Sequence, residues 1–387
     1  MKGLFCYDGP ISKDKNNNYY GTVLNNKVFR RYFTIVDSLK VAIRVEEMEN
    51  LNFKSSKITL DNIAFTDLPN LAQIKSVFIK KKVAKKLKKE IQNTDILFIR
   101  LPSFIGNLAV EIAKEMNKPY IIEMVGCPWD SLWNHSFKGK IIAPWMTLKT
   151  KYHLKNATDV VYVTNSFLQK RYPTKGNNVS CSNVELPITE NIVLENRLEK
   201  INKSNNNLII GTAAAVNVRY KGQQFIIEAI SRLKELGIYI EYQLVGWGDN
   251  TYLKKKAKEF GIEDQVTFLG ALNHDDIFVW LDSIDIYAQP SQQEGLPRAL
   301  IEAMSRGCPS IGAATGGIPE LIENEFIFSN TNDRITEICN ILKDFNQQKM
   351  LEQAIRNFEE SKFYEKKSIQ KRRSTFFENF VNNNILK

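Results

Sequence analysis

Residues 284–304 read Ile-Asp-Ile-Tyr-Ala-Gln-Pro-Ser-Gln-Gln-Glu-Gly-Leu-Pro-Arg-Ala-Leu-Ile-Glu-Ala-Met. The first six are mostly apolar, which predicts a buried strand over residues 284–289. A polar loop follows, and Pro297 stands at the first position of a predicted helix over residues 297–306, because its fixed φ suits that position. The N–H groups of the first helical turn would point back into the loop and offer a seat for an anionic group. Gly295 would let the backbone approach a ligand closely.

Strand and helix patterns alternate on both sides of this stretch. Short apolar runs predict strands at residues 3–7, 40–45, 95–101, 119–125, 159–164 and 179–186, and then at 208–213, 239–245, 265–269, 309–313 and 325–329. Segments with helical spacing separate them, as the strand–helix–strand units of a parallel sheet require. The predicted fold is α/β, with two doubly wound, Rossmann-like domains that face each other across a cleft. Ligands are expected beyond the carboxyl ends of the strands.

Length and composition agree with two domains. The chain has 387 residues, of which 43% are hydrophobic and 25% charged, so a disordered or fibrous chain is excluded. The polar, Asn-rich residues 191–207 predict a linker between an N-terminal domain (residues 1–190) and a C-terminal domain (residues 208–364). The last predicted helix, about residues 365–387, is expected to pack back on the N-terminal domain.

Two carboxylates flank the predicted anion seat. Glu294 would lie at its mouth, and Glu302 about one and a half turns along the helix. Carboxylates repel a phosphate, so they suit hydrogen bonds from sugar or ribose hydroxyls better. A surface loop and an ordinary charged helix face remain the alternative.

Two other strand ends carry candidate ligand groups. Residues 208–222 read Leu-Ile-Ile-Gly-Thr-Ala-Ala-Ala-Val-Asn-Val-Arg-Tyr-Lys-Gly, so a strand that ends near Gly211 is followed by two cations, Arg219 and Lys221, before a helix. These cations could clamp a diphosphate, although paired cations in a loop are often simply solvated. Gly316 and Gly317 follow another strand and could admit a ligand or form no more than a turn.

Together these residues resemble the donor-site signature of glycosyltransferase family 4. The matching segments are Glu294-Gly295-Leu296-Pro297 with Glu302, Gly307-Cys308-Pro309, Gly316-Gly317-Ile318-Pro319-Glu320-Leu321, Lys221-Gly222, Gly246-Trp247-Gly248-Asp249 and Phe268-Leu269-Gly270. The resemblance covers residues 208–325 and extends to the first half only as a fold expectation. It implies a retaining group 1 glycosyltransferase of GT-B fold that uses a nucleotide-diphosphate sugar.

The resemblance also implies a role for each matching residue. Glu294 would contact the transferred sugar, Glu302 the ribose hydroxyls and Lys221 the diphosphate. The implied donor site further includes Gly21, Gly211, Gly246, Gly270, Ala271, Gly295, Leu296, Pro297 and Arg298, with Gly270 and Ala271 near the base. Relatives usually carry an Arg five residues before the Lys, where this chain has Val216. Arg219 would substitute for that Arg, which makes Glu294, Lys221 and Arg219 the implied catalytic group.

The first half offers weaker candidates. Asp8-Gly9-Pro10 and Tyr20-Gly21-Thr22 resemble a long version of the glycine loop after a first strand, and Gly21 would then face the diphosphate across the cleft. Relatives often place a His just after the strand that corresponds to residues 119–125. Here Trp129, Asp130 and His135 follow it as candidates for the acceptor, none at the expected position. Simple packing is the alternative for all three.

The sequence has no Asp-x-Asp, no His/Cys cluster with metal spacing and no Ser/His/Asp arrangement. We therefore expect transfer without metal or cofactor, in which Arg219, Lys221 and the helix N-terminus stabilise the leaving diphosphate. The resemblance implies a hexosyltransferase with a donor of UDP or GDP type, which retains the anomeric configuration while a donor phosphate oxygen takes the acceptor proton. It also implies a glycan or lipid-linked glycan acceptor in bacterial capsule, O-antigen or lipopolysaccharide synthesis.

Three other classes stay open. A sugar-nucleotide epimerase shares the two-domain architecture. An NAD-dependent dehydrogenase would need Gly-x-Gly-x-x-Gly, which Gly246-Trp247-Gly248 does not complete. A basic, non-catalytic nucleic-acid-binding protein would explain the positive charge, although we expect no nucleic-acid partner.

The formal charge of +10 is unevenly distributed. Residues 1–190 hold 29 Lys and Arg against 17 Asp and Glu, a net +12, whereas residues 191–387 hold 24 against 26. Residues 71–92, from Leu71 to Gln92, carry eight Lys and one Glu. Their apolar residues keep roughly helical spacing: Ile74, Val77, Phe78, Ala84, Leu87 and Ile91. This predicts a basic amphipathic helix that docks on an anionic membrane or, alternatively, covers the core with a solvated face.

Targeting features favour the cytoplasm. Five scattered cysteines without a Cys-x-x-Cys pair are typical of reduced thiols. The first residues lack the long apolar region of a leader, and no run of 18 apolar residues occurs. We expect a cytoplasmic protein, peripheral on the inner face of the cytoplasmic membrane.

Overall fold

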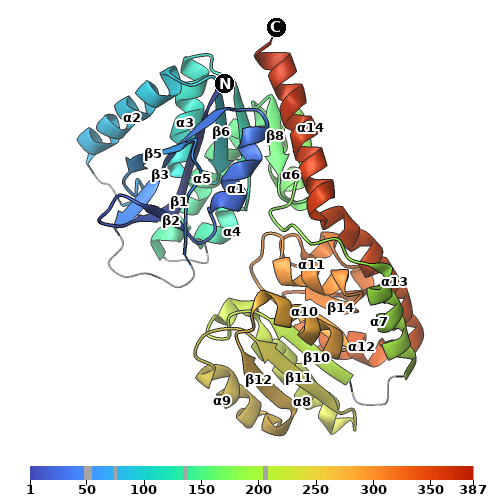
Figure 1. Ribbon diagram of the computed structural model, residues 1–387. Coiled ribbons are helices and arrows are strands. Elements are labelled where there is room, and N and C mark those ends of the chain that lie inside the picture. Colours follow the sequence, from blue (N-terminus) through green and yellow to red (C-terminus); the bar gives the residue numbers. More distant parts are fainter. Residues whose placement is uncertain (48–54, 74–75, 134–136, 204–207, 387) are drawn as a thin grey trace. The chain divides into compact units, whose positions relative to one another are not determined.

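The computed structural model describes residues 1–47, 55–73, 76–133, 137–203 and 208–386 (Figure 1). These form two compact units. The first comprises Met1–Cys181 and Gln370–Lys387, and the second comprises Ser182–Ile369. Among the helices described, none combines the length and the apolar character needed to cross a membrane.

The first unit is built on a largely parallel sheet. Its parallel strands are β1 (Lys2–Lys13), β3 (Ser38–Glu47), β5 (Ile63–Leu68), β6 (Ile96–Leu101), β7 (Tyr120–Met124), β8 (Asp159–Tyr162) and β9 (Asn177–Ser180). They lie in the order β5-β3-β1-β6-β7-β8-β9, and the short antiparallel strands β2 (Tyr19–Gly21) and β4 (Ser56–Lys57) continue from the end of β1. The chain therefore starts in the middle of the sheet and winds outward in both directions, as in doubly wound folds.

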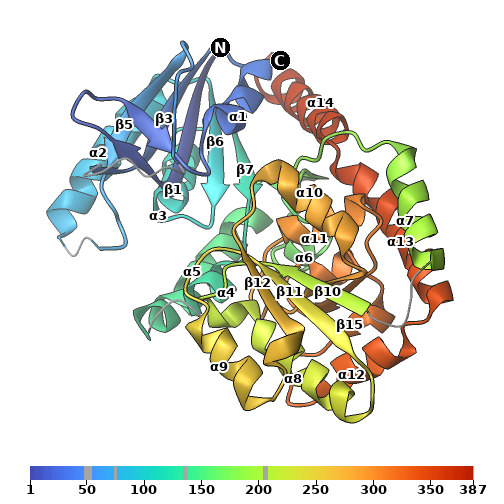
Figure 2. The ribbon, with the colours of Figure 1, turned by 60° about the horizontal axis from the view of Figure 1, so that its bottom comes forward.

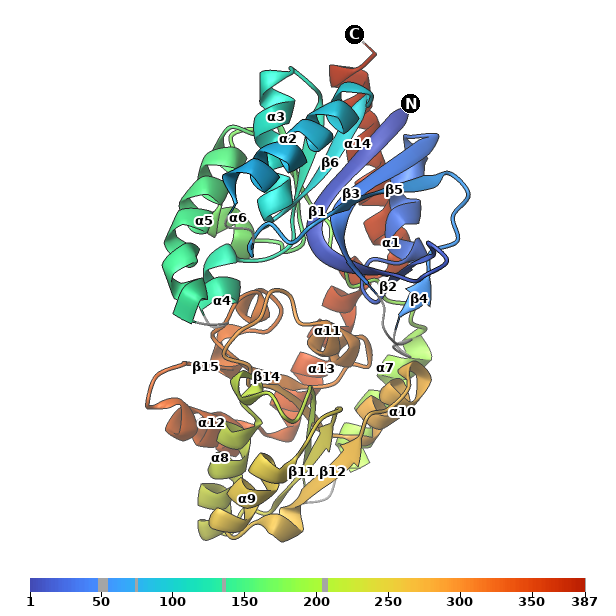
Figure 3. The ribbon, with the colours of Figure 1, turned by 90° about the vertical axis from the view of Figure 1, so that its left-hand side faces the viewer.

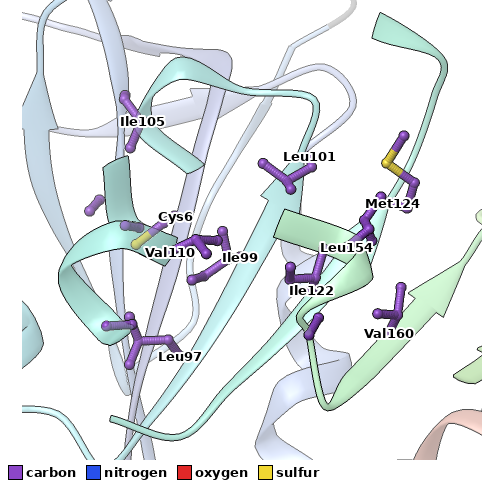
Figure 4. Close-up of a cluster of buried hydrophobic side chains, with 14 of the residues drawn as sticks. Cys6, Leu97, Ile99, Leu101, Ile105, Val110, Ile122, Met124, Leu154 and Val160 are labelled. Atoms are coloured by element: carbon purple, nitrogen blue, oxygen red, sulfur yellow. The ribbon is translucent and has the colours of Figure 1, made fainter. Parts of the chain in front are cut away.

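Helices cover both faces of this sheet (Figure 3). One face carries α2 (Val77–Gln92), α3 (Phe104–Glu115), α5 (Phe137–Lys155) and α6 (Phe167–Arg171), and the other carries α1 (Asn26–Arg30), a 3-10 turn (Arg31–Thr34) and part of α14 (Lys366–Asn384). Alternate strand residues supply the two cores, since side chains along a strand point to opposite faces. Leu97, Ile99 and Leu101 enter the core under α3, where Figure 4 shows them beside Ile122 and Met124.

The opposite face holds a buried ion pair. Arg100 and Glu123 come from neighbouring strands, with Arg100 Nη2 2.7 Å from Glu123 Oε2. The Tyr32 hydroxyl donates to Glu123 Oε1 at 2.9 Å. Burial opposes the charge of Glu123, but Arg100 and Arg31 outweigh it, so the pKa of this carboxyl is lowered. Phe377 of α14 packs on the same face, against Tyr32 and Phe98.

The second unit repeats the strand order of the first. Its strands are β10 (Leu208–Ala213), β11 (Ile240–Val245), β12 (Val266–Gly270), β13 (Ile286–Gln289), β14 (Ser310–Ala313) and β15 (Ile327–Phe328), all parallel, in the order β12-β11-β10-β13-β14-β15. In Figure 2, β10, β11 and β12 lie side by side. Strand order reverses between β10 and β13, and such a switch point is where ligands bind in this class of fold.

Helices also cover both faces of the second sheet. One face carries α8 (Gln223–Glu235), α9 (Thr251–Glu259) and α12 (Arg334–Asp344), and the other carries α7 (Asn191–Lys203), α10 (His274–Ser283), α11 (Arg298–Ser305) and α13 (Gln347–Ser361) (Figure 3).

The predicted linker was wrong for most of its length. Residues Asn191–Lys203 form helix α7 inside the second unit, and the rest of the predicted linker, residues 204–207, lies outside the described residues. The Arg197 guanidinium donates to the carbonyl oxygens of Leu281 (2.7 Å) and Ile284 (2.6 Å). The helix is polar overall, but Arg197 and Ile201 bury one side of it, which composition alone did not indicate.

Other local predictions for the first unit were also wrong. Strand β5 and helices α4 (Pro128–Trp133) and α5 were not predicted, and the strand expected at residues 179–186 is β9, Asn177–Ser180. The expected glycine loop is absent at Asp8-Gly9-Pro10: β1 runs through these residues with a register shift, where Pro10 is tolerated. The Asp8 carboxylate instead accepts the N–H groups of Phe104 and Ile105, at the start of α3.

Candidate active site

The second unit brings two predicted segments together at the carboxyl ends of β10 and β13. The loop after β10 runs to Gly222, the loop after β13 runs to Pro297, and the N–H of Gln292 donates to the carbonyl oxygen of Tyr220 at 2.7 Å. Helix α11 begins at Arg298, one position after the predicted first helical residue, so Pro297 is its N-cap in extended backbone (φ −74°, ψ 116°). The N-terminus of α11 therefore opens beside both loops.

An ion pair joins the two loops. Lys221 Nζ lies 2.6 Å from Glu294 Oε1, and the two side chains are 22% and 13% exposed. The neighbouring Gln289 is buried, and its Nε2 donates to Ser291 Oγ at 2.9 Å and to Glu294 Oε1 at 3.3 Å. The Tyr287 hydroxyl donates to Gln289 Oε1 at 3.1 Å. Glu294 is thus oriented by a cation on one loop and by a buried polar chain that comes up from β13.

Glycines let the surrounding loops approach each other. Gly222 has φ +80°, and a Cβ there would lie 1.9 Å from the carbonyl oxygen of Pro290. Gly316 has φ +57°, and a Cβ there would lie 2.1 Å from the carbonyl oxygen of Glu294. A Cβ at Gly246 would lie 1.9 Å from the carbonyl oxygen of Ala214. No L side chain fits at these contacts, so the backbone around the Lys221–Glu294 pair is held in one arrangement.

Glu302 lies one turn into α11 and is 7% exposed. Burial raises the pKa of its carboxyl, and the positive charges of Arg298 and His274 partly offset this rise. The surface-face alternative is therefore wrong for Glu302. A buried carboxylate near a helix N-terminus suits acceptance of hydrogen bonds from hydroxyl groups.

The structure places Arg219 against helix α9. Its guanidinium lies over the Tyr252 ring of α9, 4.6 Å from the ring centroid, although it is only two residues from Lys221. Val216, where relatives carry an Arg, is buried.

The other predicted donor residues differ in their surroundings. Gly211 packs inside the unit, because a Cβ there would lie 2.5 Å from Trp280. Gly270 (φ +74°) accepts the N–H of Gly246 at 2.8 Å, and Ala271 beside it is exposed. Gly295 has open space where a Cβ would be, Leu296 is half-buried and Arg298 is exposed.

The candidates of the first half that the structure describes make local contacts. Gly21 belongs to β2, where a Cβ would lie 1.8 Å from the carbonyl oxygen of Leu24, so a turn requires this glycine. Trp129 stacks on Trp133 with ring centroids 4.8 Å apart and packs against the core. Asp130 Oδ2 accepts from Arg171 Nη1 at 3.3 Å. His135 lies outside the described residues.

Sequence reasoning missed the polar chain below Glu294. Gln289 and Tyr287 are polar side chains within a buried strand, a signal that could have drawn attention to them. Among the residues that the structure describes, no three of His, Cys, Asp and Glu are grouped so that they could hold a metal ion.

The chain is similar to known glycosyltransferases. The profile of the family "Glycosyl transferases group 1" matches residues 195–375, which include the whole site. Protein CapJ of Staphylococcus aureus is 32% identical over 91% of this chain and 90% of its own length. The amylovoran biosynthesis glycosyltransferase AmsK of Erwinia amylovora is 39% identical over 27% of each chain.

A solved structure has the same fold. HepE of Anabaena, in complex with UDP, is 17% identical and covers 98% of this chain and 100% of its own, with a TM-score of 0.63. The fold is therefore GT-B, as the sequence predicted, and the family match selects a transferase among the enzyme classes left open above. The chain belongs to the group 1 glycosyltransferases.

Proposed function

We propose that this protein is a retaining hexosyltransferase of family 4. It moves a sugar from a nucleotide-diphosphate donor of UDP or GDP type to a glycan or lipid-linked glycan during synthesis of a bacterial surface polysaccharide such as capsule, O-antigen or lipopolysaccharide. The names of its relatives, among them the amylovoran biosynthesis enzyme, support the pathway class. The observation that carries the proposal is the Lys221–Glu294 pair, 2.6 Å apart, at the switch point beside the N-terminus of α11.

The ion pair suggests how the donor is recognised. Without donor, Lys221 and Glu294 neutralise each other. An arriving diphosphate offers Lys221 more negative charge than one carboxylate does, so Lys221 turns to the phosphate oxygens. Glu294 is then left to accept hydrogen bonds from the sugar hydroxyls, still held by Gln289. Glu302, buried on α11, accepts hydrogen bonds from the ribose hydroxyls.

Three elements of the second unit stabilise the negative charge of the leaving diphosphate. Lys221 supplies a point charge and the first-turn N–H groups of α11 supply a partial positive charge. Arg219, exposed in the same loop, supplies a second full charge when it leaves the Tyr252 ring. These preorganised groups act without a metal or cofactor in this proposal.

The transferred sugar retains its anomeric configuration if the acceptor attacks the face from which the diphosphate departs. The acceptor oxygen bonds to the anomeric carbon while the bond from that carbon to the phosphate oxygen breaks, and a phosphate oxygen of the leaving group takes the acceptor proton. The products are the glycoside and the nucleoside diphosphate. Glu294 positions the sugar and forms no covalent bond.

The acceptor is proposed to be membrane-borne, which places the enzyme at the inner face of the cytoplasmic membrane. The seven lysines of α2 support this, but its predicted apolar face needs correction. Leu87 and Ile91 are buried, whereas Val77 and Phe78 are 62% and 84% exposed, and Ile74 lies outside the described residues.

A ligand panel and two variants test the proposed reaction. The midpoint temperature of thermal unfolding should rise in the presence of UDP or GDP and stay unchanged with NAD or RNA. Product formation from a panel of UDP- and GDP-sugars, followed by mass spectrometry, should then fall at least about a hundredfold in Lys221→Ala and in Glu294→Gln. NMR of the product reads the anomeric configuration. Turnover of both variants within about tenfold of wild type, or an inverted product, would contradict the proposal.

A further inference from the structure

Helix α5 is apolar on two opposite sides. Its inner side, with Ala143, Met146 and Leu154, is buried in the core of the first unit. Its outer side carries a second row of large apolar residues: Phe137, Ile141, Trp145, Leu148 and Tyr152. Steps of four, four, three and four residues keep this row within an arc of about 80° on an α-helix. We call these five residues the α5 stripe.

The α5 stripe is exposed. Phe137 is 79%, Ile141 67%, Trp145 49%, Leu148 68% and Tyr152 63% accessible to solvent. Single exposed apolar residues are ordinary, but five in a row on one helix form a continuous patch, which marks an interaction surface. The patch continues toward α2, whose Val77 and Phe78 are also exposed, because both helices line one groove through Val77 and Trp145.

The charges around this patch are almost all positive. Helix α5 contains five lysines and no acidic residue, and α2 contains seven lysines and one glutamate. Lys80 and Lys81 of α2 line the shared groove together with Lys149 of α5, which is paired with Glu111 of α3 at 2.8 Å. Lysines that flank a row of Trp, Tyr, Phe, Leu and Ile are typical of a helix that lies in the interface of an anionic bilayer.

We propose that the α5 stripe inserts into the headgroup region of an anionic lipid membrane, with the lysines of α5 and α2 against the lipid phosphates. Charge complementarity favours this occupant over a second copy of the chain, since two such basic faces repel each other. The aromatic residues at both ends and in the middle of the stripe suit the interface, where an apolar ring and a polar edge are both accommodated. This binding involves no donor, so its failure would leave the proposed transfer reaction untouched.

Vesicle flotation with matched variants tests the proposal. Vesicles of phosphatidylglycerol and phosphatidylcholine should retain the wild-type protein at low salt, and vesicles of phosphatidylcholine alone should retain much less. The fraction of protein bound to anionic vesicles should be at least about tenfold smaller for the double variant Ile141→Glu/Leu148→Glu than for wild type. The control Leu236→Glu/Val279→Glu adds the same charge at sites that are 64% and 71% exposed in the second unit, and should bind like wild type.

Further measurements separate folding and other partners from lipid binding. Both double variants should keep the circular dichroism spectrum and melting temperature of wild type, since all four sites lie on the surface. Brominated lipids should quench tryptophan fluorescence in wild type and less in Trp145→Phe. The proposal is overturned if anionic vesicles do not retain the wild type, if both double variants bind equally, or if ultracentrifugation shows a dimer that the stripe variant alone abolishes.

Discussion

The two units share one strand order but differ in where their chemistry lies. In the second unit, glycines and backbone hydrogen bonds lock the loops at the carboxyl ends of β10 and β13 around Lys221 and Glu294. In the first unit, the buried Arg100–Glu123 pair lies within the body, and the unusual features are on outer helices, the lysines of α2 and the α5 stripe. The same doubly wound frame thus supports an ordered group of loops in one unit and a broad exposed surface in the other.

The two ion pairs make this difference measurable. The Arg100 and Glu123 side chains are each 4% exposed, whereas Lys221 and Glu294 are 22% and 13% exposed. We infer that the first pair serves stability and the second serves ligand binding, and the predictions below test that division.

The largest effect is expected from Arg100→Met. This change removes the cation paired with the buried Glu123 carboxylate, and the charges of Arg31 and Arg373 only partly replace it, so the free energy of unfolding should fall by about 3–5 kcal/mol. Urea unfolding measures it, with Arg232→Met as control, because the Arg232–Glu228 pair lies on the surface and should contribute about 0–1 kcal/mol. Equal losses in the two variants would show that the buried pair has no special structural role.

Lys221→Ala is expected to have the opposite effect, with a large loss of turnover and a small loss of stability. Turnover should fall at least about a hundredfold, equivalent to about 2.7 kcal/mol of transition-state stabilisation, while unfolding changes by about 1 kcal/mol. Steady-state kinetics and urea unfolding of the same preparation provide both numbers. If the variant loses several kcal/mol of stability and keeps its turnover, the Lys221–Glu294 pair stabilises the fold and does not bind the donor.

A pair of glycine substitutions tests how tightly the loops of the second unit are locked. Gly222 and Gly237 have φ of +80° and +79°, but a Cβ at Gly222 would meet Pro290 whereas a Cβ at Gly237 meets nothing within 4 Å. Gly237→Ala should therefore cost only the backbone strain, about 1 kcal/mol. Gly222→Ala should cost about 2–3 kcal/mol and also weaken nucleotide binding. Identical thermal shifts for the two variants would contradict the described contact.

The smallest effect concerns His153 on the inner side of α5. Burial, with help from Lys114 and Lys149, lowers the pKa of its imidazole to about 4. The unfolded chain takes up a proton near pH 6.5, so the stability that neutral His153 contributes is present above about pH 6.5 and is lost as the pH falls toward about 4. Urea unfolding at pH 7 and pH 5 should show a smaller loss for His153→Leu than for wild type. Parallel losses would exclude His153 as the cause.

The fold and the elements that carry Lys221 and Glu294 could be predicted from the sequence because their signals are local. A strand, a Glu-Gly-Leu-Pro loop and a helix occupy 21 consecutive residues at 284–304, and Lys221 stands directly before Gly222, whose positive φ few other residues tolerate. Their pairing follows from the topology, since β10 and β13 are neighbours in the sheet.

Other features could not be predicted, for physical reasons specific to each. Helix α5 has apolar residues on two opposite sides and Pro144 within it, so it lacks the single-sided period by which a helix is recognised. Helix α7 is so polar that it resembles a linker, yet Arg197 buries itself by capping three main-chain carbonyls, of Leu281, Ile284 and Arg306. The placement of Arg219 on Tyr252 depends on a contact between distant segments that no local pattern encodes.

Nucleotide affinity tests the central claim most directly. Isothermal titration of UDP and GDP into wild type, Lys221→Ala and Lys349→Ala compares two Lys–Glu pairs of the second unit, because Lys349 Nζ lies 3.1 Å from Glu325 Oε2, near the start of β15. We expect one of the two nucleotides to bind the wild type and Lys349→Ala equally, and to bind Lys221→Ala at least about tenfold more weakly. Undiminished affinity in Lys221→Ala would contradict the assignment of the donor site.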